Sequence, residues 1–142
     1  MLSKWQPRLL AYVCQAKEDF YCRAAVCQFV LEHGYVPLNP FMIFDYFLHD
    51  RVERDAIRAA NASILRRCDE VWVFGIGIPD GVLAEIQFAN ELGKAVRLFS
   101  ISSHVADIRS LEPWELIVDP NLCGPEWSRT KLIEAFLPKW TD

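Results

Sequence analysis

The sequence lacks the features of a membrane-spanning, secreted or nucleic-acid-binding protein. It has no apolar run near the roughly 20 residues that a membrane-spanning helix needs. The apolar stretch at residues 9–14 is too short for the core of a signal peptide. The formal net charge of −4 at pH 7 gives no basic excess of the kind that nucleic-acid surfaces carry. We therefore expect a soluble, cytoplasmic protein that binds neither membranes nor nucleic acid.

Cysteine and histidine lack the spacing of a metal site or a disulfide framework. The five cysteines are odd in number and form no C-x-x-C pair, and the three histidines are scattered. Reduced cysteines within apolar patterns behave as small hydrophobic residues. We expect reduced thiols, no zinc site and no cofactor.

The apolar content is sufficient for one folded core. The chain has 142 residues, of which 52% are hydrophobic, and it contains no repeat, linker or low-complexity segment. This length and composition predict a single domain over residues 1–142.

One stretch in the middle of the chain organises the predicted fold. Residues 71–74 are apolar without polar alternation, which is typical of a strand buried on both faces of a parallel sheet. Glycine, proline and aspartate interrupt residues 75–81, and an amphipathic helix is predicted over residues 82–92. Gly93 ends that helix, and residues 95–99 form the next strand. Strand, turn, helix and strand make a βαβ unit.

The rest of the chain predicts more elements of the same kind. We expect strands at residues 9–14, 35–38 and 115–118, and helices at residues 19–33, 51–67 and 124–138. Together they predict an α/β fold, a flavodoxin/Rossmann-like three-layer sandwich with a parallel sheet of about five strands. Ligands bind such sheets at the carboxyl ends of the strands, where the turn at residues 75–81 lies.

Glu85 is the residue whose position is hardest to explain by structure alone. Val82, Ile86 and Ala89 define the buried stripe of the predicted helix, and Glu85 falls on or beside that stripe. An uncompensated carboxylate facing the core is costly, so we expect it near an opening in the first helical turn, where the helix dipole favours negative charge. A capping glutamate would also explain it, but that motif needs Ser or Thr at position 82. These arguments leave a structural and a functional role open.

The residues around Glu85 resemble a known pattern. The sequence PDGVLAEI (residues 79–86), then Ala89, then LGKAV (residues 92–96), resembles the D-G-x-x-x-E-I…A…L-G-K-P-V pattern of the nucleoside 2-deoxyribosyltransferase-like superfamily. Residues 65–75 resemble the strand that precedes this pattern. The resemblance covers roughly residues 9 to 100, and the nearest branch is of the DUF4406 type.

This resemblance implies a reaction and a nucleophile. The glutamate matching Glu85 attacks the anomeric carbon in the resembled enzymes, which implies cleavage or transfer at the N-glycosidic bond of a (deoxy)nucleoside or nucleoside 5′-monophosphate. Asp80 and the backbone of Gly81 would orient the sugar hydroxyls. Pro79 stands where characterised transferases tend to carry another acidic residue, which weakens transfer more than hydrolysis.

The resemblance also leaves other classes of function open. A fold can keep its pocket and lose its chemistry, so a non-catalytic nucleotide-binding module is the alternative. A purely structural oligomer would require the turn at residues 75–81 to be packed shut. The resembled enzymes are oligomers with sites close to subunit contacts, so we expect a homo-oligomer, a dimer or larger.

Substrate-binding candidates come from the predicted carboxyl edge of the sheet. Lys17 and Arg23 can meet a 5′-phosphate or be ordinary solvated charges. The turn at residues 15–19 carries no glycine, and no phosphate-binding motif is present. The segment at residues 41–48 is rich in aromatic side chains. These side chains can give flat walls to a base or sugar, or pack in the core or against a subunit. Asp55 and Asn61 are polar candidates on the helix at residues 51–67, where a solvated face is the simpler explanation. The substrate-binding candidates are Gln15, Lys17, Asn39, Phe41, Phe44, Gly75 and Gly81.

Overall fold

Four parallel strands form the central sheet of the computed structural model, which describes residues 5–48 and 50–118. Their order is β2-β1-β3-β5, and their bounds are Leu10–Gln15 (β1), Val36–Leu38 (β2), Glu70–Phe74 (β3) and Ala95–Phe99 (β5). The helices between them are η2 (Lys17–Cys22), α1 (Arg23–Glu32), α2 (Pro40–Ile43), α3 (Asp45–Leu48), α4 (Arg54–Arg67) and α5 (Asp80–Glu91). Two short 3-10 helices follow, η3 (Val105–Asp107) and η4 (Pro113–Glu115).

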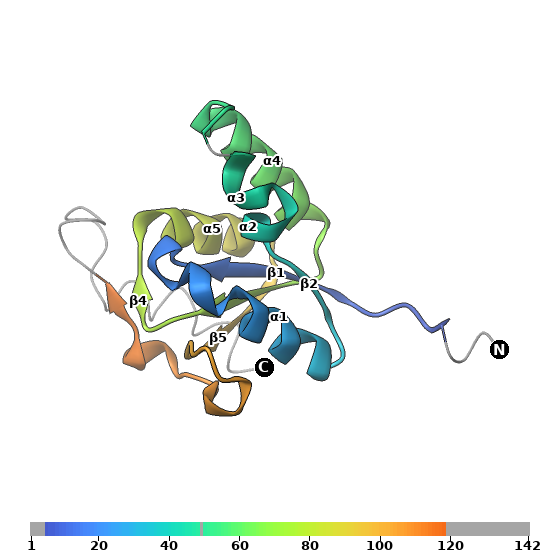
Figure 1. Ribbon diagram of the computed structural model, residues 1–142, viewed down its shortest axis with the longest axis vertical. Helices are drawn as coiled ribbons and strands as arrows, with labels where there is room; N and C mark the ends of the chain where they lie inside the picture. The colour runs from blue at the N-terminus through green and yellow to red at the C-terminus, as the bar shows by residue number, and fades with distance from the viewer. Residues whose placement is uncertain (1–4, 49, 119–142) are drawn as a thin grey trace.

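The sheet is covered on both faces, which confirms the predicted three-layer α/β fold. Strand alternation sends Ala11 and Val13 of β1 into the core under α1, and Tyr12 and Cys14 into the core shared with α4 and α5. In Figure 1, α5 lies above β1 and α1 lies below it. All residues of β1 after Leu10 are buried, as expected for a central parallel strand.

The sheet reverses its winding direction at β1. This strand pairs with β2 on one side and with β3 on the other, so that Tyr12 lies between Leu38 and Val71. Crevices for ligands form at such a reversal, outside the carboxyl ends of the two strands. In this protein the crevice is next to Gln15 and Phe74, the last residues of β1 and β3.

The expected fifth strand forms elsewhere, which corrects the predicted sheet. The strand at the end of the described residues, β6 (Ile117–Val118), pairs with β4 (Gly77–Ile78) in a separate two-stranded parallel sheet. Strand β4 lies within the turn that we expected to be irregular. Gly75 donates its N–H to Phe99 O and then turns at φ +118°, which carries the chain out of the main sheet before β4. The helix predicted at residues 124–138 lies outside the described residues.

One further expectation, the helix after the first strand, differs in detail. The helix predicted at residues 19–33 begins as the 3-10 helix η2 and continues as α1 before Gly34, which has φ +84°. Within the described part of the chain, no helix is long and apolar enough to cross a membrane. The described cysteines Cys14, Cys22, Cys27 and Cys68 are free thiols.

The packing of α5 onto the sheet can be tested at Ile86, whose side chain is fully buried in the core shared by α4 and α5. Replacement Ile86→Ala is expected to lower the free energy of unfolding by about 2–4 kcal/mol, because it removes buried methyl groups and leaves a cavity. Urea unfolding followed by circular dichroism measures this loss. The matched control Leu92→Ala, at a side chain that is 39% exposed at the end of the same helix, should cost less than about 1 kcal/mol. Equal losses in the two variants would contradict the packing.

Candidate active site

A small cavity opens at the carboxyl end of β1, on the side of the sheet that faces α4 and α5. Its volume is about 50 Å³. Strand β1 forms its floor, the segment with α2 and α3 covers it, and α4 and α5 each contribute one polar side chain. The lining residues are Val13, Cys14, Gln15, Pro40, Phe41, Phe47, Asn61 and Glu85.

Glu85 is held in this cavity by a side chain of the central strand. Because α5 begins at Asp80, Glu85 lies in the second helical turn instead of the first turn that we expected. Its carboxylate accepts a hydrogen bond from the Tyr12 hydroxyl. Burial raises the pKa of Glu85 to about 7, although the Tyr12 hydroxyl and the neighbouring Cys14 thiol oppose the rise.

Tyr12 and Cys14 remain neutral beside this carboxylate. Burial is the main cause that raises the pKa of both groups, and the negative charge of Glu85 adds to it. Neither residue was among the sequence-based candidates. The available signal was the position of Tyr12 in a strand that is otherwise apolar, since a buried phenol needs a hydrogen-bond partner.

Asn61 presents an unsatisfied acceptor to the same cavity. Its Oδ1 atom is buried and has no hydrogen-bond partner among the residues that the structure describes. A buried amide oxygen without a partner is costly, so this atom is suited to accept a hydrogen bond from a bound molecule. The expectation of a solvated face is therefore wrong for Asn61. It fits Asp55, which is exposed and 3.5 Å from Arg58.

Two of the predicted binding residues, Gln15 and Asn39, bond to each other. Asn39 Nδ2 donates to Gln15 Oε1 at 2.9 Å, and Asn39 Oδ1 accepts from Phe41 N at 3.0 Å. Gln15 Nε2 donates to Asp19 O at 2.9 Å. These bonds fix the ends of β1 and β2 and begin α2, while Gln15 also lines the cavity.

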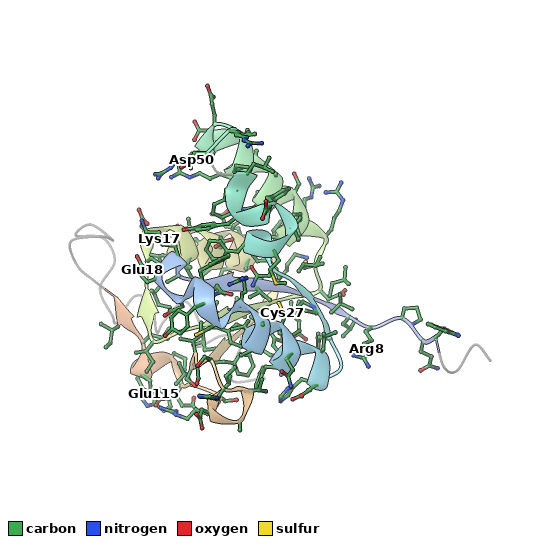
Figure 2. All side chains as sticks on the ribbon, viewed as in Figure 1. Arg8, Lys17, Glu18, Cys27, Asp50 and Glu115 are labelled. Carbon is green, nitrogen blue, oxygen red and sulfur yellow. The ribbon has the colours of Figure 1, made fainter. Side chains whose placement is uncertain are left out.

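The remaining candidates from the first half of the chain lie at different depths. Phe41 lines the cavity, and Phe44 is half-buried outside its lining. Lys17 is exposed next to Glu18 on η2, at the periphery of the molecule (Figure 2). The Arg23 guanidinium lies 4.0 Å from the centroid of the Phe20 ring and donates to Phe20 O.

The candidates around the start of α5 do not line the cavity. Asp80 is exposed, and its Oδ1 accepts from Gly81 N at 2.8 Å. Gly75 is buried at the end of β3. Within residues 5–48 and 50–118, no group of three or more histidine, cysteine, aspartate or glutamate side chains is arranged to hold a metal ion.

A larger hollow of about 370 Å³ lies beside η2, β4 and β6, lined by Ala16, Glu18, Asp19, Gly77, Ile78, Pro79 and Ile117. Burial raises the pKa of Asp19 there, and the neighbouring Glu18 adds to the rise. The two hollows share no lining residue. We assign the candidate site to the smaller one because it contains both the enclosed carboxylate and the unsatisfied amide oxygen.

Solved structures show which fold this chain has. The chain is similar to a 2-deoxyribosyltransferase from Leishmania mexicana, with a TM-score of 0.51 and 21% identity over 93% of this chain and 98% of that chain. It is also similar to a 2-deoxyribosyltransferase from the psychrotolerant bacterium Bacillus psychrosaccharolyticus, with a TM-score of 0.51 and 19% identity over 64% of this chain and 72% of that chain. The protein therefore has the Rossmann-like fold of 2-deoxyribosyltransferases, as expected from the sequence.

Residues 11–99 match the model of a domain of unknown function, DUF7768, so the chain belongs to that family. This match does not show the DUF4406-type branch that we expected. No functionally curated protein matches the sequence.

The raised pKa of Glu85 makes stability depend on pH. Burial raises this pKa from 4.5 to about 7, so the folded state keeps a proton that the unfolded chain releases. The stabilisation is fully present below pH 4.5 and is lost as the pH rises through 7. Replacement Glu85→Gln, which stays neutral, should raise the free energy of unfolding at pH 8 by roughly 1–3 kcal/mol and change it little at pH 5. Urea unfolding at both pH values measures this difference, and an effect independent of pH would contradict the raised pKa.

Proposed function

We propose that the protein cleaves or transfers the N-glycosidic bond of a (deoxy)nucleoside or nucleoside 5′-monophosphate, with Glu85 as the nucleophile. The observation that carries the proposal is the Glu85 carboxylate, which is enclosed in a cavity at the crevice of the sheet and bonded to Tyr12. A 2-deoxyribosyltransferase fold supports it, since solved structures similar to this chain carry that name.

The reaction places positive charge where this carboxylate lies. As the bond between the anomeric carbon and the base breaks, the carbon takes oxocarbenium character, and one Glu85 oxygen forms a covalent bond with it. The base departs with the bonding electrons and is protonated. Water then releases the sugar, or a second base attacks the same carbon and accepts it.

The surroundings of Glu85 match this task. The hydrogen bond from Tyr12 orients the carboxylate, and Tyr12 and Cys14 both favour its charged form. The unsatisfied Asn61 Oδ1 is suited to accept a hydrogen bond from a sugar hydroxyl. Glu85 attacks in its ionised form, so the proposed activity increases as the pH rises through about 7.

Asp80 does not line the cavity, so its proposed role lies outside it. Its side chain is exposed at the start of α5 and accepts a hydrogen bond from Gly81 N. We propose that it meets sugar hydroxyls or the base when a substrate is bound, together with the Gly81 backbone. A homo-oligomer, dimer or larger, is part of the same proposal.

Substrate release from a nucleoside panel tests the proposal directly. The protein is incubated with ribo- and deoxyribonucleosides and their 5′-monophosphates, with and without a second base, and free base is followed by chromatography. At least one substrate should release its base, and Glu85→Ala should reduce the rate by at least about 10³-fold because the nucleophile is gone. Exchange of the base would identify a transferase.

The matched control is Glu91→Ala, which removes an exposed carboxylate from the same helix and should leave the rate unchanged. Release that persists in Glu85→Ala would exclude Glu85 as the nucleophile. Binding without release from any member of the panel would favour a non-catalytic nucleotide-binding module.

The pH profile tests the role of Tyr12. Replacement Tyr12→Phe removes a hydrogen bond that lowers the pKa of Glu85, so the ascending limb of kcat/KM should move to higher pH by roughly one unit. Initial rates between pH 5 and 9 measure the shift. A Tyr12→Phe profile that has the wild-type midpoint would show that the phenol does not control the ionisation of Glu85.

A further inference from the structure

An aromatic cluster adjoins the cavity on the side of η2. It consists of Phe20 from η2, Phe41 from α2, and Tyr46 and Phe47 from α3. The Tyr46 ring lies stacked on Phe20, with centroids 4.7 Å apart and an interplanar angle of 21°. Phe41 meets both rings edge-on, at 5.7 Å from Phe20 and 5.0 Å from Tyr46. Since Phe41 and Phe47 also line the cavity of Glu85, the stacked pair is next to that cavity.

Only one face of the Phe20 ring is left for a planar partner, because Arg23 lies over the ring. The Arg23 guanidinium carbon lies 4.0 Å from the Phe20 centroid, and the stacked Tyr46 ring lies at 4.7 Å. Both groups cannot occupy the same face at these distances, so Arg23 covers one face and Tyr46 the other. A ring in the position of Tyr46 is therefore stacked on Phe20 and edge-on to Phe41.

The backbone that carries Tyr46 has an unfavourable conformation. The four residues of α3 all have positive φ, with values of 46° for Asp45, 47° for Tyr46, 60° for Phe47 and 57° for Leu48. Each residue other than glycine in this left-handed conformation costs free energy. The aromatic contacts of Tyr46 and Phe47 offset that cost, and a movement of α3 would relieve it.

The cavity of Glu85 is too small for a nucleoside while α3 is in this position. Its volume is about 50 Å³, whereas pockets for small organic ligands usually measure roughly 300–1,000 Å³. Phe47 of α3 is one of its walls. A nucleoside therefore requires a wall to move, and α3 is the covering element with the strained backbone.

We propose that the Phe20 and Phe41 rings form the binding site for the nucleobase, and that Tyr46 occupies this site in the free protein. A base displaces Tyr46, stacks on the same face of Phe20 and lies edge-on to Phe41, while α3 leaves its left-handed conformation. Because one stacked ring replaces another, the stacking energy changes little. Ligand binding is favoured by the free energy released when α3 leaves its strained backbone conformation. The placement of the sugar at Glu85 rests on the proposed function, but the site for the base does not require turnover.

Binding of free bases tests this inference independently of catalysis, because a free base has no glycosidic bond to cleave. Isothermal titration with adenine, hypoxanthine, cytosine and thymine is carried out on wild type and Tyr46→Ala. The variant lacks the competing ring, so at least one base should bind it roughly two- to tenfold more tightly. The control Tyr21→Ala removes a tyrosine that is 69% exposed on η2 and should bind bases as wild type does.

A second variant predicts the opposite change. Glycine at position 48 removes the cost of a positive φ without touching the stacked rings, so Leu48→Gly stabilises the closed form and should weaken base binding roughly fivefold. This variant also tests the inference if Tyr46→Ala does not fold. Weaker binding by Tyr46→Ala, unchanged or tighter binding by Leu48→Gly, or no base bound by any of the proteins would overturn the inference. If Tyr46→Ala binds bases more tightly than wild type and Leu48→Gly binds them more weakly, but no turnover is found, the base site is supported and the proposed reaction is not.

Discussion

The hydrogen bond between the Tyr12 hydroxyl and the Glu85 carboxylate connects the core of the fold to the cavity that Glu85 lines. Strand β1 is buried on both faces and α5 packs against it, so a carboxylate at this contact is removed from water. Without a donor, such a group would be neutralised or would destabilise the packing. Tyr12 and Cys14 lie two residues apart on one face of the strand. Tyr12 donates to the carboxylate, and both residues lower its pKa.

The central position of β1 explains why the site forms at this end of the sheet. β2 lies on one side of this strand and β3 on the other, so the order of the strands reverses at β1. A crevice forms at such a reversal, beyond the carboxyl end of the strand. The Gln15 and Asn39 amides fix the ends of β1 and β2 to each other. This rigid edge holds the floor of the cavity, while the strained α3 lies above it. A rigid floor and a less stable cover are the properties that a binding site needs.

The sequence predicts most of the fold, because local patterns specify it. The apolar run of β3, the stripe of α5 and Gly93 give the βαβ unit directly, and they place Glu85 on the inner face of its helix. The contact of Glu85 with Tyr12 joins residues 73 positions apart and depends on how α5 packs onto β1, which no local pattern contains. The same limit explains β6: its residues read as a strand, but pairing with β4 depends on the turn at Gly75. The sequence predicts a solvated position for Asn61, because an asparagine in an amphipathic helix is usually solvated, whereas Asn61 lines the cavity.

Three features that are each unfavourable for the folded state occur together at this site, and their proximity supports a common function. A carboxylate whose pKa is raised to about 7, an amide oxygen without a described partner and a left-handed run of residues other than glycine all border one cavity. Each is unfavourable for stability, and each would be relieved by the ligand that we propose. The developing positive charge of a sugar carbon would neutralise Glu85, a sugar hydroxyl would satisfy Asn61, and a flat base would replace Tyr46. Because a single nucleoside would relieve all three, the strained features support one binding event and not three independent defects.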